Sequence, residues 1–238
     1  MQAAVSDIAL DQNGAVLRGT AGGAGPAVLL LHAGGERRRV WAPLFAPLID
    51  AGLRVVAYDQ RGHGDTAGPE TSLQTLAEDV RAMIAREATP VVVVGASIGG
   101  LAALAALAEP STAWRVAGLV LVDVVPDPNP DRARAWLDER GLRRDRAAFV
   151  DDTLSQGPML LATAAALDLP ILLVRGGVRS PLGDDDVDRL QAANPRVEVT
   201  TVPSAGHLVA HDAPAELAAI VAGRASRWLA AASPFSSR

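Results

Sequence analysis

The chain has 238 residues, which is enough for one domain with a sizeable hydrophobic core. Its composition, with 49% hydrophobic and 21% charged residues, is that of a globular protein, and the net charge of −5 is not gathered in one block. Nothing in this balance favours a nucleic acid or an anionic membrane as a partner. The absence of cysteine excludes disulfides, thiolate chemistry and cysteine-ligated zinc.

The amino-terminal residues do not have the pattern of a secretory signal. Residues 1–7 contain neither a basic start nor an apolar run. We therefore expect a cytoplasmic protein in which residues 1–238 form a single domain, as a monomer or a homodimer.

The first predicted elements form an antiparallel hairpin. Residues 5–10 and 15–20 flank Asn13-Gly14, a pair that readily adopts the positive φ angles of a tight turn.

Continuous apolar runs then alternate with helical patterns. The runs are residues 27–31, 54–58, 91–94, 116–122, 171–174 and 197–202, and the helical patterns are residues 40–51, 73–87, 98–108, 184–193 and 213–229. Strands that are apolar throughout belong to parallel sheets covered by helices on both faces. The sequence therefore predicts an α/β fold, with a mostly parallel, doubly wound sheet of about eight strands.

The alternation breaks between residues 124 and 169. This segment contains three prolines and then amphipathic stretches that include Trp136, Phe149 and Leu154. Long connections in compact domains usually cover a site, so we interpret residues 124–169 as a short helical lid. Its apolar side chains, Trp136, Phe149 and Leu154, are then candidates for substrate binding. The alternative is an ordinary crossover helix with long loops.

A strand-to-helix junction carries the first candidate for catalysis. Gly95-Ala96-Ser97-Ile98-Gly99 has the pattern G-x-S-x-G between a valine-rich strand and an alanine- and leucine-rich helix. Glycines two residues before and after the serine permit a sharp turn that exposes the hydroxyl at the carboxyl end of the strand. Ser97 is therefore the predicted nucleophile.

A serine hydroxyl needs a base to take its proton. Of the four histidines, His207 follows the last predicted strand, so it can return to the carboxyl edge of the sheet near Ser97. His207 is therefore the predicted general base. We assign no catalytic role to the other three histidines: His32 ends a predicted strand, His63 lies in a predicted tight loop and His211 lies at the start of the last predicted helix.

These motifs together resemble the α/β-hydrolase fold family over essentially the whole chain. The matching features are Ser97 in the elbow, His207 after the last strand, the His32-Ala33-Gly34-Gly35 loop and the Asp59-Gln60-Arg61-Gly62-His63-Gly64 loop. The resemblance implies a catalytic triad, and it implies an oxyanion hole made by the backbone N–H groups of Ile98 and Gly34. Ala33 stands where the family usually has glycine, and the lid is short for the family.

The acid of the triad has two candidates. Relatives most often place it after the seventh strand, but residues 178–181 contain no carboxylate, and Asp184 is the nearest acid. Asp184 also suits the start of a helix. Asp123 ends the apolar strand that follows the one with Ser97, and a carboxylate there needs a partner. We favour Asp123 and keep Asp184 as the alternative.

The predicted function is hydrolysis of a carboxylic ester, a lactone or a thioester of a small molecule through an acyl-serine intermediate. No metal and no cofactor are expected, since no His, Asp and Glu group has the spacing of metal ligands. The alternative is a member of the same fold that binds a ligand without hydrolysing it, or one with lyase-like chemistry, because fold alone does not decide the reaction.

Overall fold

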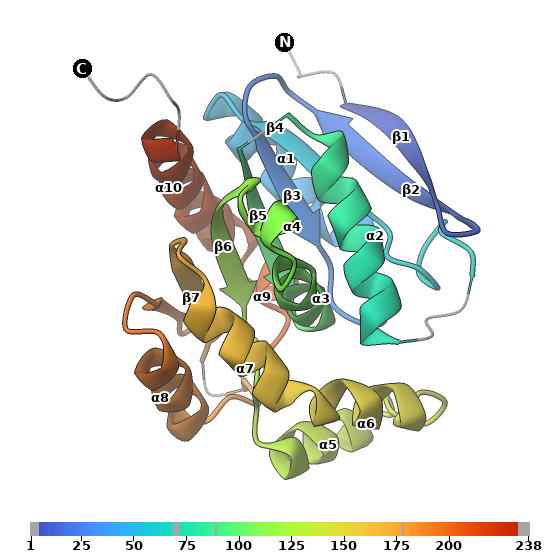
Figure 1. The fold of residues 1–238 in the computed structure, drawn as a ribbon, viewed down its shortest axis with the longest axis vertical. Helices are drawn as coiled ribbons and strands as arrows, with labels where there is room; N and C mark the ends of the chain where they lie inside the picture. Colours follow the sequence, from blue (N-terminus) through green and yellow to red (C-terminus); the bar gives the residue numbers. More distant parts are fainter. Residues whose placement is uncertain (1–4, 69–71, 89, 178, 233–238) are drawn as a thin grey trace.

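A central sheet runs through the protein, with helices packed on both of its faces (Figure 1). The computed structural model describes residues 5–68, 72–88, 90–177 and 179–232. The eight strands lie in the order β1-β2-β4-β3-β5-β6-β7-β8. They are β1 (Val5–Gln12), β2 (Ala15–Gly22), β3 (Ala27–Leu31), β4 (Arg54–Tyr58), β5 (Val91–Ala96), β6 (Val116–Val122), β7 (Ile171–Gly176) and β8 (Glu198–Val202).

The predicted α/β fold with its mostly parallel sheet is confirmed. Strands β1 and β2 form the expected hairpin around Asn13 and Gly14, which have φ angles of 43° and 76°. Strand β2 pairs antiparallel with β4, and every later pairing in the sheet is parallel. The parallel strands therefore bring their carboxyl ends, and the loops that follow them, to one edge.

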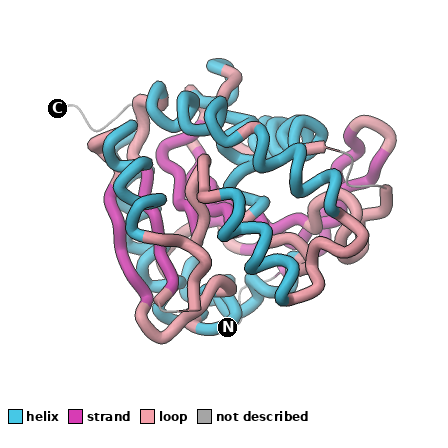
Figure 2. The backbone as a smooth tube through the Cα atoms, turned by 90° about the horizontal axis from the view of Figure 1, so that it is seen from below, coloured by secondary structure: helices cyan, strands magenta, loops and turns pink. Residues whose placement is uncertain are grey.

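Helices cover both faces of the sheet because alternate residues of the central strands point in opposite directions. Val91 and Val93 of β5 belong to one buried cluster, and Val92 and Val94 belong to the other. The first cluster includes residues of α2 (Leu73–Arg86), α3 (Ile98–Leu107), α7 (Gly157–Ala166) and α8 (Asp184–Ala193), and the second includes residues of α1 (Ala42–Asp50) and α10 (Pro214–Ala232). Figure 2 shows the sheet enclosed between these helices.

Three helices connect β6 to β7, across the segment interpreted as a lid. They are α5 (Pro130–Glu139), α6 (Ala147–Ser155) and α7. Helix α7 packs against α3 and α8, as a helix that covers a sheet does. Residues of α5 and α6 line a cavity at the carboxyl edge of the sheet, and Figure 1 shows these two helices beside each other beyond the ends of the strands.

The remaining helical segments are short. They are η1 (Arg38–Trp41), α4 (Pro110–Ala113) and α9 (Val209–Asp212). Within the described ranges, no helix combines the length and the apolar character that a membrane crossing requires.

Candidate active site

Ser97 occupies a strained turn between β5 and α3. Its φ of 49° and ψ of −120° lie in a region that residues with side chains rarely adopt. The turn is possible because its neighbours are glycines. A Cβ on Gly99 would lie 2.6 Å from the carbonyl oxygen of Leu31, and a Cβ on Gly95 would lie 2.5 Å from Cα of Gly100. The close approach of backbone to backbone thus holds Ser97 at the carboxyl end of β5.

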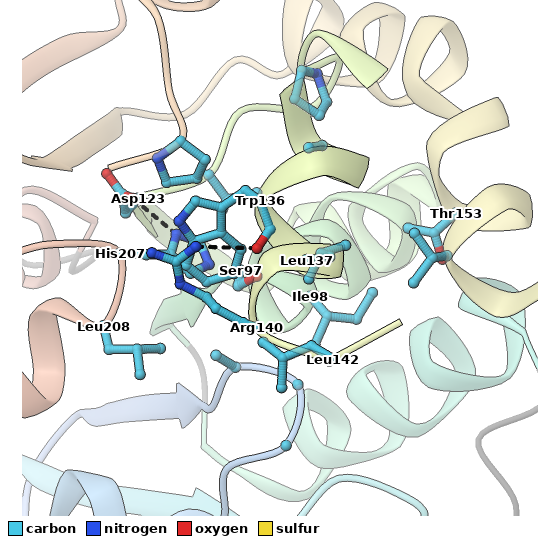
Figure 3. Close-up of a pocket in the computed structure, with 18 of the residues that line it drawn as sticks. Ser97, Ile98, Asp123, Trp136, Leu137, Arg140, Leu142, Thr153, His207 and Leu208 are labelled. Carbon is cyan, nitrogen blue, oxygen red and sulfur yellow. Dashed lines mark hydrogen bonds and ion pairs between the residues drawn. The ribbon is translucent and has the colours of Figure 1, made fainter. Parts of the chain in front are cut away.

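Asp123 and His207 meet at the same edge of the sheet. Asp123 directly follows β6 and has no exposed surface, and His207 lies in the loop between β8 and α9. Nδ1 of His207 and Oδ2 of Asp123 are 2.8 Å apart (Figure 3). An ionised carboxylate only accepts hydrogen bonds, so Nδ1 carries the proton. Nε2 of His207 then has a free lone pair for a proton.

Two further groups bind the buried carboxylate of Asp123. The backbone N–H of Gly176 donates to Oδ1 at 2.7 Å, and the hydroxyl of Ser180 lies 2.8 Å from each carboxylate oxygen. Such charge-assisted hydrogen bonds offset the cost of removing a carboxylate from water. They also fix the carboxylate in the orientation that faces His207.

Asp184, the alternative acid, lies elsewhere. It is the first residue of α8, its side chain is 86% exposed, and it pairs with Arg175 at 2.5 Å. The structure therefore brings Asp123, and not Asp184, to His207.

Gly34 and Ile98 lie next to each other beside Ser97. A Cβ on Gly34 would meet Cγ2 of Ile98 at 3.7 Å, and all three residues line the same cavity. Ile98 is the first residue of α3, so its N–H has no acceptor within the helix and points outward at the positive end of the helix dipole. This arrangement suits the stabilisation of a negative oxygen.

The loop that contains Gly34 is held by two histidines. Nε2 of His63 accepts the N–H of Gly35 at 3.0 Å, and Nη1 of Arg146, at the start of α6, is 3.2 Å from the same nitrogen. Nε2 of His32 accepts the N–H of Gln60 at 2.9 Å, and Nδ1 of His32 lies 2.8 Å from the carbonyl oxygen of Ala33. These contacts fix the loop and connect it to the segment before α6.

Burial keeps His32 neutral. It lowers the pKa of His32 from 6.5 to about 4, and the hydrogen bond to the Ala33 carbonyl opposes this effect only in part. A neutral ring suits both contacts, because one nitrogen accepts a hydrogen bond and the other donates one.

The cavity has a volume of about 670 Å³ and is lined by all the candidate site residues except Asp184. The predicted substrate-binding residues Trp136, Phe149 and Leu154 lie in its wall. The ring of Trp136 packs edge-on against that of His207, with centroids 4.5 Å apart and an angle of 66° between the planes. The guanidinium of Arg140 lies 4.1 Å from the centroid of the Trp136 ring, and its Nη1 donates to the Trp136 carbonyl at 3.1 Å (Figure 3).

The sequence alone did not identify two residues of this site, Ser180 and Glu36. Ser180 lies in the loop after β7, where a carboxylate was sought, and it supplies a hydroxyl to Asp123 instead. Glu36 also lines the cavity, and burial raises the pKa of its carboxyl above the ordinary value. Neither residue belongs to a motif, so only its position in the loop after β7 or after β3 could have pointed to a place in the site.

In the part of the chain that the structure describes, no three His, Asp or Glu side chains form a group suited to a metal ion.

Comparison with known proteins identifies the family of the chain. The family model described as the alpha/beta hydrolase family matches residues 28–220, a span that contains Ser97, Asp123 and His207. Esterase Rv0045c of Mycobacterium tuberculosis (strain ATCC 25618 / H37Rv) is 29% identical, and the match covers 89% of this chain and 87% of that protein.

A second relative is similar over a shorter stretch. Protein phosphatase methylesterase 1 of Mus musculus is 39% identical over 115 residues, which cover 44% of this chain and 29% of that protein. The chain spans less than half the length of several of the curated relatives that it matches.

Solved structures share the fold. The thioesterase domain from the curacin biosynthetic pathway superimposes with a TM-score of 0.73 at 20% identity, covering 92% of this chain and 99% of that domain. At this identity the likeness concerns the arrangement of the elements.

Proposed function

The chain belongs to the α/β-hydrolase family, and on that premise we propose that it hydrolyses a carboxylic ester, or a related lactone or thioester, through an acyl-serine intermediate. The observation that carries the proposal is the hydrogen bond between the buried Asp123 and His207, at the edge of a cavity that Ser97 also lines. Hydrolase relatives that include an esterase and a methylesterase support ester-type hydrolysis.

The proposed reaction begins when Oγ of Ser97 attacks the carbonyl carbon of the substrate and Nε2 of His207 takes its proton. Asp123 stays ionised and stabilises the imidazolium that forms. The proton then passes from His207 to the leaving alcohol or thiol, and the acyl group remains on Ser97. Water, activated by the same histidine, releases the acid and restores the hydroxyl.

The developing negative charge on the carbonyl oxygen is assigned to the N–H groups of Ile98 and Gly34. Donors that are held in place before the reaction stabilise this charge without reorganisation, and each is typically worth about 3 kcal/mol. The contacts of His63 with Gly35 and of His32 with Ala33 supply the rigidity that this role requires.

The cavity suits a small molecule with an apolar part. Its volume of about 670 Å³ lies in the range of small-ligand sites, and Trp136, Phe149 and Leu154 give it apolar walls. Because Trp136 also packs on His207, we propose that the lid both selects the substrate and shields the histidine from water.

The test is a panel of p-nitrophenyl esters of increasing chain length, together with a lactone and a thioester, on the purified protein. Ser97→Ala and His207→Ala are each expected to lower kcat by at least about a thousandfold. Ser111→Ala and His211→Ala are matched controls at exposed positions outside the proposed machinery, and they should stay within about twofold of the wild-type rate.

A Ser97→Ala protein that keeps one tenth of the wild-type rate would contradict the nucleophile assignment. Binding without turnover of any member of the panel would favour the non-hydrolytic alternative. Hydrolysis in isotopically labelled water distinguishes the lyase-like alternative, because only hydrolysis places the label in the released acid.

A further inference from the structure

The backbone N–H of Gly34, which is assigned to the oxyanion hole, belongs to a peptide group with a fixed carbonyl. The carbonyl oxygen of Ala33 lies 2.8 Å from Nδ1 of His32 and accepts the N–H of Glu36 at 3.1 Å. In a trans peptide the C=O and the N–H point in opposite directions, so these contacts set the direction of the Gly34 N–H. A glycine adopts many backbone conformations, so the loop also needs an anchor after Gly34.

That second anchor is His63, in the loop after β4. The residue is only 5% exposed. Its Nε2 accepts the N–H of Gly35 at 3.0 Å, and its Nδ1 lies 3.1 Å from the carbonyl oxygen of Arg61. A carbonyl only accepts hydrogen bonds, so Nδ1 carries the proton and Nε2 is an acceptor. One tautomer of a buried ring thus satisfies both contacts and fixes the peptide group between Gly34 and Gly35.

The lid reaches the same ring nitrogen. Nη1 of Arg146, at the start of α6, lies 3.2 Å from Nε2 of His63, although the two residues are 83 positions apart in the chain. A guanidinium only donates hydrogen bonds, so this contact requires the same tautomer of His63 as the contact with Gly35 does. The ring of His63 is therefore held between the lid and the oxyanion loop.

The lid also lies against the loop itself. A Cβ on Gly34 would lie 3.9 Å from Nη1 of Arg146, and a Cβ on Gly35 would lie 3.9 Å from Cδ2 of Leu142, which are ordinary contact distances. Both lid residues line the cavity together with Ser97. The lid therefore touches the oxyanion loop at its two glycines, in addition to covering the substrate cavity.

We propose that Arg146 is a positioning residue, which holds the ring of His63 and thereby keeps Gly34 and Gly35 in the conformation that presents the Gly34 N–H to the reacting carbonyl. The lid then contributes to the chemical step as well as to the choice of substrate. The proposal deepens the proposed function and rests on it, since it concerns the oxyanion hole of the same site.

The first test is the kinetics of Arg146→Met on the panel of p-nitrophenyl esters. Methionine keeps an unbranched stem and removes the donors. We expect kcat to fall by about fivefold, by one factor for all chain lengths, with KM within about twofold of wild type. Arg143→Met is the matched control, because this lid arginine pairs with Asp138 and Asp151, and it should keep the wild-type rate. A change confined to KM, or one that grows with chain length, would overturn the proposal.

The second test asks whether Arg146 acts through His63. His63→Leu removes the acceptor, so kcat should fall by at least about tenfold, and His63→Gln, which returns an acceptor oxygen, should recover part of the loss. Adding Arg146→Met to His63→Leu should then lower kcat little further. Two effects that multiply would show independent action and overturn the proposal. Arg146→Met carries the test alone if His63→Leu does not fold.

Hydrogen exchange of the Gly35 amide, followed by nuclear magnetic resonance without substrate, separates this proposal from the proposed function. The hydrogen bond to His63 protects this amide, so exchange should be at least about threefold faster in Arg146→Met, faster still in His63→Leu and unchanged in Arg143→Met. That result supports the role of Arg146 even if no ester is hydrolysed. Hydrolysis by wild type with an unchanged kcat in Arg146→Met contradicts this role and leaves the proposed function intact.

Discussion

Nδ1 of His207 lies 2.8 Å from Oδ2 of Asp123, a carboxylate that is fully buried at the end of β6. The pair joins two loops that are 84 residues apart in the chain. Because the carboxylate accepts this hydrogen bond, it selects the tautomer of His207 that leaves Nε2 able to take a proton.

Asp123→Asn should lower kcat by about three to four orders of magnitude while the protein remains folded, because an amide favours the wrong tautomer and does not stabilise the imidazolium. Asp184→Asn should leave kcat within about twofold, since Asp184 is exposed and pairs with Arg175. Steady-state kinetics and thermal melting of both variants check this prediction. The reverse ranking would assign the acid to Asp184.

Ser180 is expected to act through Asp123. Its hydroxyl lies 2.8 Å from both carboxylate oxygens, so Ser180→Ala removes part of what orients the acid. We expect kcat to fall by about tenfold with little change in KM, because the hydroxyl acts on the acid and not on the substrate. Kinetics of Ser180→Ala beside Ser111→Ala provide the measurement. A rise in KM at constant kcat would instead place Ser180 in substrate binding.

The lid should set the preference for chain length. Trp136 lines the cavity and packs on His207, so Trp136→Ala should lower kcat/KM for long acyl chains more than for acetate. Trp114→Ala, at a tryptophan that is 78% exposed, is the matched control and should change neither. A single common factor across all chain lengths would mean that Trp136 acts on His207 alone.

His32 should make the protein sensitive to acid. The ring titrates near 6.5 in the unfolded chain and at about 4 in the folded protein, so the unfolded chain binds more protons between these values. Stability should therefore decrease as the pH falls from 6.5 towards 4, by up to about 1.4 kcal/mol per pH unit from this group.

Nuclear magnetic resonance of the histidine ring gives the direct check on His32. It should show a neutral ring protonated at Nδ1 down to pH 5. A midpoint near the ordinary value of 6.5 would contradict this prediction.

The sequence predicted the elements that local patterns determine. Three features could be interpreted from neighbouring residues alone. The valine run forms β5, the glycines around Ser97 permit a sharp turn, and the apolar run before Asp123 is a buried strand that ends at this carboxylate. The mostly parallel sheet of about eight strands was predicted from the same local patterns, but the order of the strands was not, because it depends on contacts between distant segments.

Long-range polar contacts were not predictable in this way. Arg38, for example, lies in a run of three arginines, yet its side chain is only 10% exposed and pairs with the buried Asp59. The partners of Ser180 and His63 come likewise from distant segments, and a single sequence does not encode which loops meet. The choice between Asp123 and Asp184 stayed open for the same reason.

The central claim is that Ser97 is an activated nucleophile, and labelling with a fluorophosphonate followed by peptide mapping tests it most directly. Such a probe reacts with a serine whose hydroxyl a base activates. We predict that the label is found on the peptide that contains Ser97, that Ser97→Ala abolishes labelling, and that His207→Ala slows it by at least about a hundredfold. Labelling of another residue, or labelling of Ser97 at an unchanged rate in His207→Ala, would contradict the proposed mechanism.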